Sequence, residues 1–146
     1  MTKETIYIPN LNLYSVRDGI VQQQAGLNWG FANAHVNPED AYIALPRSFF
    51  EEYPDFFPQH GSIINVLWDD GTRMRCLLEG TQRINGLIYP KQISSYDDKS
   101  FIGHYLRQRL GVSPNRRIDM TDLDNYGRNY ISVSKENDSD YYFDFS

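Results

Sequence analysis

Residues 62–83, SIINVLWDDGTRMRCLLEGTQR, decide the fold class of this chain. The stretch contains two runs rich in β-forming residues, and Asp70-Gly71 lies between them. An Asp-Gly pair tolerates the positive φ angles that a tight hairpin turn requires. The stretch therefore predicts an antiparallel β-hairpin.

Further short strands are expected along the rest of the chain, separated by turn residues. Residues 11–17 and 20–29 can pair as a second hairpin through Asp18-Gly19. The other expected strands cover residues 41–46, 85–94, 116–120, 129–135 and 141–146, and a turn is expected at 121–128. Such a series, connected by hairpins throughout, predicts a mainly β fold, either a barrel or a sandwich.

Two short helices are predicted among these strands. Residues 46–57 begin with Pro46, which is tolerated in a first helical turn, and Pro54 and Pro58 end the segment. Residues 101–110 place their apolar side chains on one face, with Ser100 as a cap and Gly111 as the stop. We expect the helices at the ends of the barrel. A parallel α/β fold would need a helix between most strands.

Length and composition indicate one soluble globular domain over residues 1–146. The chain has 17.0 kDa of mass, with 40% hydrophobic and 14% aromatic residues, too many for a disordered segment. No stretch approaches the roughly 20 apolar residues of a membrane span, and the N-terminus does not resemble a signal peptide. The single cysteine, Cys76, favours a reducing cytoplasm and is expected to be a buried, inert thiol.

Charge is distributed unevenly, although the formal net charge is only -5. Residues 1–71 carry 3 basic and 9 acidic side chains, residues 72–117 carry 9 and 3, and residues 118–146 carry 2 and 7. This segregation permits one positive face that binds phosphates. It is equally compatible with basic and acidic side chains that neutralise each other on neighbouring strands.

Motifs for enzyme chemistry are missing. His35, His60 and His104 are dispersed, without the spacing of a zinc site, and neither a phosphate-binding glycine loop nor a GxSxG motif occurs. Asp69-Asp70 belongs to the predicted turn, and residues 121–128 lack the ligand series of a calcium loop. We therefore expect no catalytic residue, no metal and no cofactor.

Two polar segments lie where a strand protein needs no polarity. The first, within residues 22–37, contains Gln22, Gln23, Gln24, Asn28, Asn33, His35 and Asn37; the second, within residues 81–95, contains Thr81, Gln82, Arg83, Asn85, Lys91, Gln92, Ser94 and Ser95. Asn and Gln can pair with the edge of adenine and Arg with that of guanine, whereas Lys and Ser hold phosphates. Two such loops could read a DNA groove, but the same composition is also ordinary for hairpin loops.

Single residues within these segments are ambiguous. Trp29 favours an anchoring role, and Phe31 could be an exposed wedge or a second anchor. Arg83, beside Gly86 in the basic segment, is the best candidate for a guanine contact. Arg107 could clamp a phosphate or be an ordinary surface charge, and Arg109, Arg116 and Arg117 are similarly undecided.

An ordered set of short motifs resembles a known family. GLNWG, NPEDAYIALP, FFP, DDG, LRQRLGV, DLDNYGR and YYFDFS follow one another from about Leu11 to the end of the chain. Together they resemble the C-terminal DNA-recognition domain of NgoFVII- and BfiI-type restriction endonucleases. In that family this domain follows a phospholipase D-like nuclease domain and is similar to the plant B3 DNA-binding domain.

The resemblance implies an open seven-stranded, antiparallel-rich pseudobarrel with short helices at its ends. It also implies that two arms, corresponding to the two polar segments, grip double-stranded DNA in the major groove, and it makes the helix at 101–110 and the turn at 121–128 scaffold. The DNA-contacting residues expected on this basis are Gln24, Asn28, Trp29, Phe31, Asn33, His35, Asn37, Gln82, Arg83, Asn85, Lys91, Gln92, Ser94, Ser95 and Arg107.

The chain departs from the family pattern at two places. Phe31-Ala32 stands where relatives carry Gln-Arg, so specificity is expected to rest on Asn33, His35 and the second arm. The paired His-x-Lys motifs of the nuclease are absent. We therefore expect either a separated specificity domain that works with a nuclease domain in a bacterial cytoplasm, or a stand-alone relative; in isolation it should be monomeric. A β-barrel that binds a protein or carbohydrate, and an enzyme with an unfamiliar site near His35 or His104, remain as alternatives.

Overall fold

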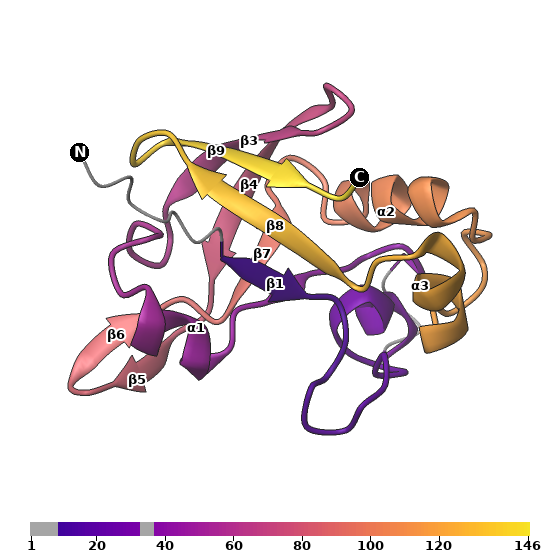
Figure 1. The fold of residues 1–146 in the computed structure, drawn as a ribbon, viewed down its shortest axis with the longest axis horizontal. Helices are drawn as coiled ribbons and strands as arrows, with labels where there is room; N and C mark the ends of the chain where they lie inside the picture. Colours follow the sequence, from indigo (N-terminus) through magenta and orange to yellow (C-terminus); the bar gives the residue numbers. More distant parts are fainter. Residues whose placement is uncertain (1–8, 33–36) are drawn as a thin grey trace, which may run out of the picture.

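A computed structural model describes residues 9–32 and 37–146, and its central element is a mixed seven-stranded sheet (Figure 1). The strand order is β1-β8-β9-β3-β4-β7-β2, and all neighbours are antiparallel except β3 and β9. The strands are β1 (Asn10–Asn12), β2 (Ile43–Ala44), β3 (Ile63–Trp68), β4 (Arg73–Glu79), β7 (Gln92–Ser95), β8 (Tyr130–Lys135) and β9 (Asp140–Asp144). A separate two-stranded ribbon consists of β5 (Gln82–Ile84) and β6 (Leu87–Tyr89).

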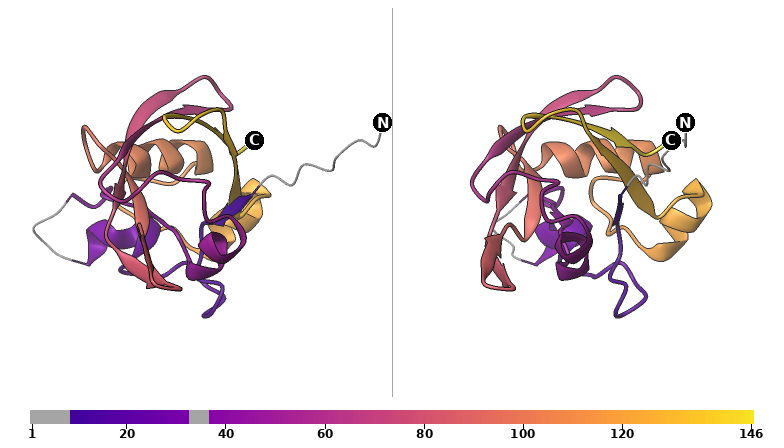
Figure 2. Two further views of the ribbon diagram at one scale, coloured as in Figure 1. Left: turned by 90° about the vertical axis from the view of Figure 1, so that its left-hand side faces the viewer. Right: turned by 60° about the vertical axis from the view of Figure 1, so that its left-hand side comes forward.

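The sheet curls until its two edge strands, β1 and β2, contact each other (Figure 2). No hydrogen-bonded ladder joins these two strands in the described part of the chain, so the barrel stays open at this seam. This arrangement confirms the predicted mainly β, seven-stranded pseudobarrel.

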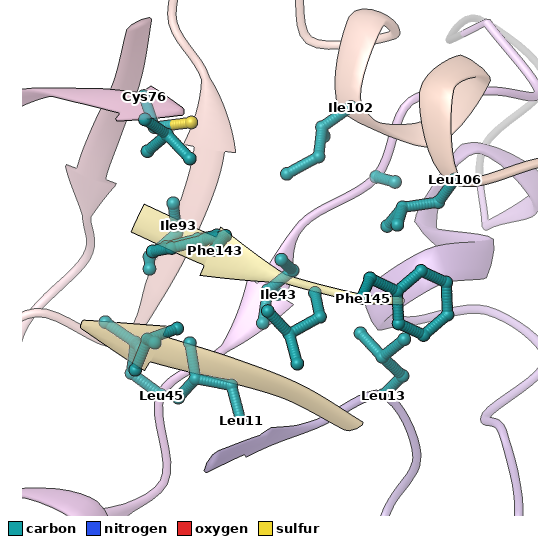
Figure 3. Close-up of a cluster of buried hydrophobic side chains, with 14 of the residues drawn as sticks. Leu11, Leu13, Ile43, Leu45, Cys76, Ile93, Ile102, Leu106, Phe143 and Phe145 are labelled. Carbon is teal, nitrogen blue, oxygen red and sulfur yellow. The ribbon is translucent and has the colours of Figure 1, made fainter. Parts of the chain in front are cut away.

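The hairpin predicted from residues 62–83 is present as β3 and β4. Alternate side chains of both strands point inward, and the Trp68 amide donates to the Thr72 carbonyl across the turn (2.8 Å). The inward side chains join a core that includes Cys76, Ile93, Phe143 and Phe145 (Figure 3). Burial raises the pKa of the Cys76 thiol to about 12, as expected for an inert cysteine.

Helices close the two ends of the barrel (Figure 1). At one end, beside the β5–β6 ribbon, α1 (Arg47–Glu52) buries Phe49 and Phe50. At the other end, α2 (Phe101–Leu110) buries Ile102 and Leu106 and lies next to α3 (Met120–Tyr126). Both predicted helices are present: α2 has the expected bounds, whereas α1 covers only Arg47–Glu52 of the expected 46–57.

Two predictions near residue 120 are wrong. Residues 116–118 form a loop instead of a strand, and the expected turn at 121–128 begins as helix α3. Asp119 caps this helix: its carboxylate accepts from the Asp122 amide (3.1 Å), while the Asp122 carboxylate accepts from the Asp119 amide (2.8 Å). This reciprocal capping box gives side-chain acceptors to the Asp119 and Asp122 amides at the start of the helix.

Two further expected strands differ in the structure. Residues 20–29 keep a single bridge, Ser15 to Ile20, and then form the 3-10 helix η1 (Gly26–Phe31) instead of a second hairpin strand. The strand expected at 85–94 is divided into β6 and β7 at Pro90. Proline has no amide hydrogen, so it cannot continue a ladder.

A nearly buried ion pair joins β3, α2, α3 and the C-terminal end. The Arg109 guanidinium binds both carboxylate oxygens of Asp69 at 2.8 Å and also donates to the Tyr105 and Tyr126 hydroxyls. The Phe145 amide donates to the same carboxylate (2.7 Å). Burial alone would raise the pKa of Asp69, but these hydrogen bonds hold it below its ordinary value. Arg109 is thus a structural residue.

A second polar node is the side chain of Asn28, which is fully buried. Its Nδ2 atom donates to the carbonyls of Gln22 (2.9 Å) and Ile118 (2.8 Å), and its Oδ1 atom accepts from the Ile118 amide (2.8 Å). Arg107 Nη2 reaches the same oxygen at 3.4 Å. One amide side chain therefore connects η1 to the loop that precedes it, to the loop before α3, and to α2.

Asp69→Asn should lower the free energy of unfolding at pH 7 by about 3 kcal/mol, because it leaves the Arg109 charge without its carboxylate. The stabilisation from a carboxyl with a depressed pKa is present above its unfolded pKa of about 3.9 and is lost as the pH falls through the folded pKa. Denaturant unfolding at a series of pH values should show the difference from the wild type shrinking below about pH 4. Asp138→Asn, at an exposed pair with Lys135, is the matched control and should change little.

Asn28→Ala should destabilise the protein by at least about 2 kcal/mol, because it leaves several buried backbone groups without partners. Hydrogen exchange should speed up most at the Ile118 amide, whose acceptor is removed. Asn125→Ala, at an exposed position on α3, should change stability by less than about 0.5 kcal/mol. Equal losses in the two variants would contradict the role given to Asn28.

Candidate nucleic-acid interface

The first polar segment, residues 22–37, is named arm 1. Backbone contacts that bring Gly30 close to Asn37 and Asp40 form its neck. The Gly30 amide donates to the Asp40 carbonyl (2.8 Å), and the Asp40 amide donates to the Asn37 carbonyl (2.9 Å). A side chain at Gly30 would place its Cβ 2.1 Å from the Asn37 carbonyl oxygen, so only glycine fits there. The second glycine of GLNWG, Gly30, therefore lets the chain pass close to the backbone of Asn37 and Pro38.

Both aromatic residues of arm 1 serve as anchors. Trp29 is half-buried, meets Tyr42 edge to face (6.1 Å between centroids) and lies under the Lys99 ammonium (5.4 Å). Phe31 is also half-buried, with the guanidinium carbon of Arg117 4.8 Å from its ring centroid. Each cation–π contact adds attraction to the packing. Phe31 is thus an anchor instead of a free wedge.

The second polar segment, residues 81–95, contains the β5–β6 ribbon and then strand β7; its part at residues 81–91 is named arm 2. Asn85 and Gly86 both have positive φ, 50° and 81°, which is the signature of a type I′ turn and gives a narrow tip. Gln82 Nε2 donates to the carbonyls of Leu45 (2.9 Å) and Pro90 (2.8 Å). This anchors the ribbon to the barrel, so Gln82 has its amide hydrogens engaged at the base of the arm.

One face of arm 2 packs against the protein and the other is exposed. Ile84 is buried, and the Tyr89 ring stacks on Phe50 of α1 at 4.7 Å. Arg83 pairs in register with Ile88 on the opposite face, and both are exposed. The packing on the inner face holds the outer face in a fixed orientation.

The arms lie at opposite ends of a surface formed by β4, β7 and β2 (Figure 1). Arm 1 reaches it through Trp29 and the hydrogen bond from the Tyr42 amide to the Gly26 carbonyl (3.1 Å). Arm 2 leaves β4 after Glu79 and returns to β7 at Gln92, and these two residues pair in register. The Glu79 carboxylate in this surface is matched by Lys99 (3.1 Å) and by the Ser94 hydroxyl.

Most basic side chains of the 72–117 segment are engaged within the protein. Arg107 is buried, and Arg75, Lys99, Arg109 and Arg116 bind carboxylates. Within residues 9–32 and 37–146, no carboxylate lies within 4.0 Å of the other four, which are Arg73, Arg83, Lys91 and Arg117.

Three of these four cations lie at the arms. Arg83 is on the outer face of arm 2, Lys91 is at its base, and Arg117 is under arm 1, where its Nε donates to the Gln23 carbonyl (2.9 Å). Arg73 is at the far end of β4. The positive charge that remains for a partner is therefore concentrated at the two arms.

Four of the fifteen expected DNA contacts are corrected, because their side chains are buried and bonded within the protein. Asn28 forms the polar node described above, and Arg107 donates to the carbonyls of Leu27 and Arg116. Ser94 bonds to Glu79, and the Ser95 hydroxyl bonds to the Asp98 carbonyl. Burial of such groups is tolerated when they are hydrogen-bonded, and it leaves them unavailable to DNA. We therefore assign all four to the scaffold.

The remaining expected residues are placed as follows. Gln24, Asn37, Arg83, Asn85 and Lys91 are exposed, whereas Trp29, Phe31, Gln82 and Gln92 are half-buried; Asn33 and His35 lie outside the described residues. The strand predicted at residues 116–120 gives Arg117 no place near arm 1, whereas the loop that the structure shows there brings Arg117 under the arm.

Residues 9–32 and 37–146 contain no cluster of three His, Cys, Asp or Glu side chains that could hold a metal ion. Among the helices of these same residues, none has the length and apolar character needed to cross a membrane.

Comparison with known proteins gives one family. No curated protein matched the chain. The model of the NgoFVII C-terminal B3-like DNA-binding domain matches residues 4–137. This span contains both arms and every strand of the seven-stranded sheet except β9. The chain therefore belongs to the NgoFVII C-terminal B3-like DNA-binding domain family, the DNA-binding domain of a restriction enzyme.

Proposed function

We propose that this domain recognises a specific sequence of double-stranded DNA through the major groove, using arm 1 and arm 2, as the target-recognition domain of a restriction endonuclease. The observation that carries the proposal is the concentration of unpaired cations at the two arms. Membership of a DNA-binding family favours DNA over the protein or carbohydrate partner that the sequence left open.

Arm 2 has the shape and chemistry for direct readout. A two-stranded ribbon fits the major groove, and an arginine can bind the O6 and N7 atoms of guanine bidentately. Arg83 extends from the exposed face of a ribbon whose other face is packed against α1. Because the backbone of this ribbon is already held in place, little backbone conformational entropy is lost when Arg83 binds. Asn85 at the tip and Lys91 at the base would contact a further base edge and a phosphate.

Arm 1 supplies the second set of contacts. Its neck is fixed by Gly30 and the Asn28 node, so its exposed side chains extend from a rigid base. Gln24 and Asn37 at the two ends of the arm, together with Asn33 and His35 from the sequence analysis, are the proposed contacts. Arg117 below the arm is suited to a phosphate, because it presents its charge beside Phe31 instead of projecting with the arm.

The domain is proposed to act without metal or cofactor and to leave cleavage to a nuclease domain of the parent enzyme in the bacterial cytoplasm. Its expected state in isolation is a monomer. The overall negative charge does not oppose this function, because none of the acidic residues of 1–71 and 118–146 belongs to arm 1 or arm 2. Glu39 and Asp40 lie just after arm 1. Repulsion by the acidic residues outside the arms would favour docking through the arms alone.

Arg83→Ala should relax the preference at one base pair and weaken binding of the preferred duplex by about 1–3 kcal/mol. The measurement is a set of gel shifts with a duplex selected from a random pool and with its single-base-pair variants. Arg73→Ala removes the same charge at the opposite end of β4 and serves as the control. Equal weakening of all sequences by Arg83→Ala would make Arg83 a phosphate contact.

Arg117→Ala should weaken binding to all duplexes alike, because a phosphate contact carries no sequence information. The slope of log K against log salt should fall in magnitude by about 1. A titration of wild type and variant between low and moderate salt measures this slope. A variant with an unchanged slope but altered base preference would place Arg117 at a base instead.

A further inference from the structure

The outer face of arm 2 carries an apolar side chain directly beside its arginine. Ile88 is 49% exposed and pairs in register with Arg83. In an antiparallel pair, side chains that lie directly opposite each other have Cβ atoms about 4.5–5.5 Å apart. Arg83 and Ile88 therefore present one charged and one apolar group to the same part of a partner.

This exposure is not a consequence of a loosely attached ribbon. The inner face of arm 2 is fixed by the Gln82 hydrogen bonds, by burial of Ile84 and by the stacking of Tyr89 on Phe50. The type I′ turn at Asn85-Gly86 then fixes which face each remaining residue occupies. Ile88 cannot turn inward without breaking this packing, so it is held in solvent beside Arg83.

The chemistry of the major groove offers a single apolar partner for such a side chain. Base edges there present hydrogen-bond donors and acceptors, apart from the C5-methyl group of thymine. A methyl group on cytosine C5 occupies the equivalent position and has the same chemistry. Ile88 has no polar side-chain atom, so covering a methyl group is the contact by which it could favour one base over another.

We propose that Ile88 packs against the C5-methyl group of a pyrimidine next to the base pair that Arg83 contacts. This inference rests on the proposed function, since it assumes that arm 2 enters the major groove. Successive bases of one strand are about 3.4 Å apart along the axis. A separation of about 5 Å between the two Cβ atoms therefore suits contacts to neighbouring steps of the duplex.

The test uses the full chain and a duplex selected from a random pool. Each thymine of the selected site is replaced in turn by deoxyuridine, which removes the C5-methyl group and leaves the base-pairing edge unchanged. Each cytosine is separately replaced by 5-methylcytosine. Loss of the thymine methyl group that Ile88 covers should weaken binding about fourfold. If Ile88 faces a cytosine instead, gain of a methyl group on that cytosine should strengthen binding by a similar factor. The responsive position should lie beside the base pair whose preference Arg83→Ala relaxes.

Ile88→Ala provides the decisive arm of this experiment. The variant should bind the thymine and uracil duplexes equally at the responsive position, with an unchanged thermal unfolding midpoint because Ile88 is exposed. Ile20→Ala removes an isoleucine of the same exposure, 49%, from another loop and should keep the full thymine-to-uracil ratio. A double-mutant comparison of this kind separates a direct contact from a general loss of affinity.

The outcomes separate the inference from the proposed function. Failure to select any preferred duplex would overturn both. Selective binding that is indifferent to every methyl group, or a thymine-to-uracil ratio that survives in Ile88→Ala, would overturn this inference and leave the proposed function standing. A methyl effect on binding that is seen only at a thymine, or only at a 5-methylcytosine, supports the inference and identifies the source of the methyl group.

Discussion

The structure depends on one buried side-chain amide. Asn28 satisfies the backbone of Gln22 and Ile118, and its oxygen receives Arg107 from α2. These partners lie up to 90 residues away in sequence, so the hydrogen bonds form only when the fold brings these distant segments together. An unpaired buried amide would cost more than the bonds gain, which makes the arrangement strict. The base of arm 1 is therefore fixed by the same node that attaches α2 to the barrel.

Features with a common local signature are predictable from the sequence. The β3–β4 hairpin and helix α2 follow from neighbouring residues, such as Asp70-Gly71 and Gly111. Helix α3 is not predicted, because its capping box uses Asp122 in place of the usual Glu or Gln and the Asp-rich stretch is also typical of a turn. The resemblance to the family, carried by the order of its motifs, gave the barrel and its seven strands.

The candidate interface was predicted only as two segments, and not residue by residue. Asn28 and Gln24 belong to the same polar run, yet one is fully buried and the other is exposed. Composition cannot distinguish them, because an amide suits a core as well as a groove when its partners are present. The charge pattern of the 72–117 segment is equally ambiguous: five of its nine cations are buried or bind carboxylates, while Arg73, Arg83, Lys91 and Arg117 have no carboxylate within 4.0 Å among the described residues.

If arm 2 reads bases as proposed, its construction limits the number of base pairs that it can contact. One face of the ribbon is used for attachment, so only alternate residues are free to contact bases. Residues two apart on a strand are separated by about 6.6 Å, which is close to two base-pair steps. A ribbon of six paired residues with a two-residue turn can thus address about two or three adjacent base pairs. A longer recognition site would have to draw its remaining specificity from arm 1. The rigid neck of arm 1 is suited to that task, because side chains held in fixed positions can discriminate between neighbouring base pairs.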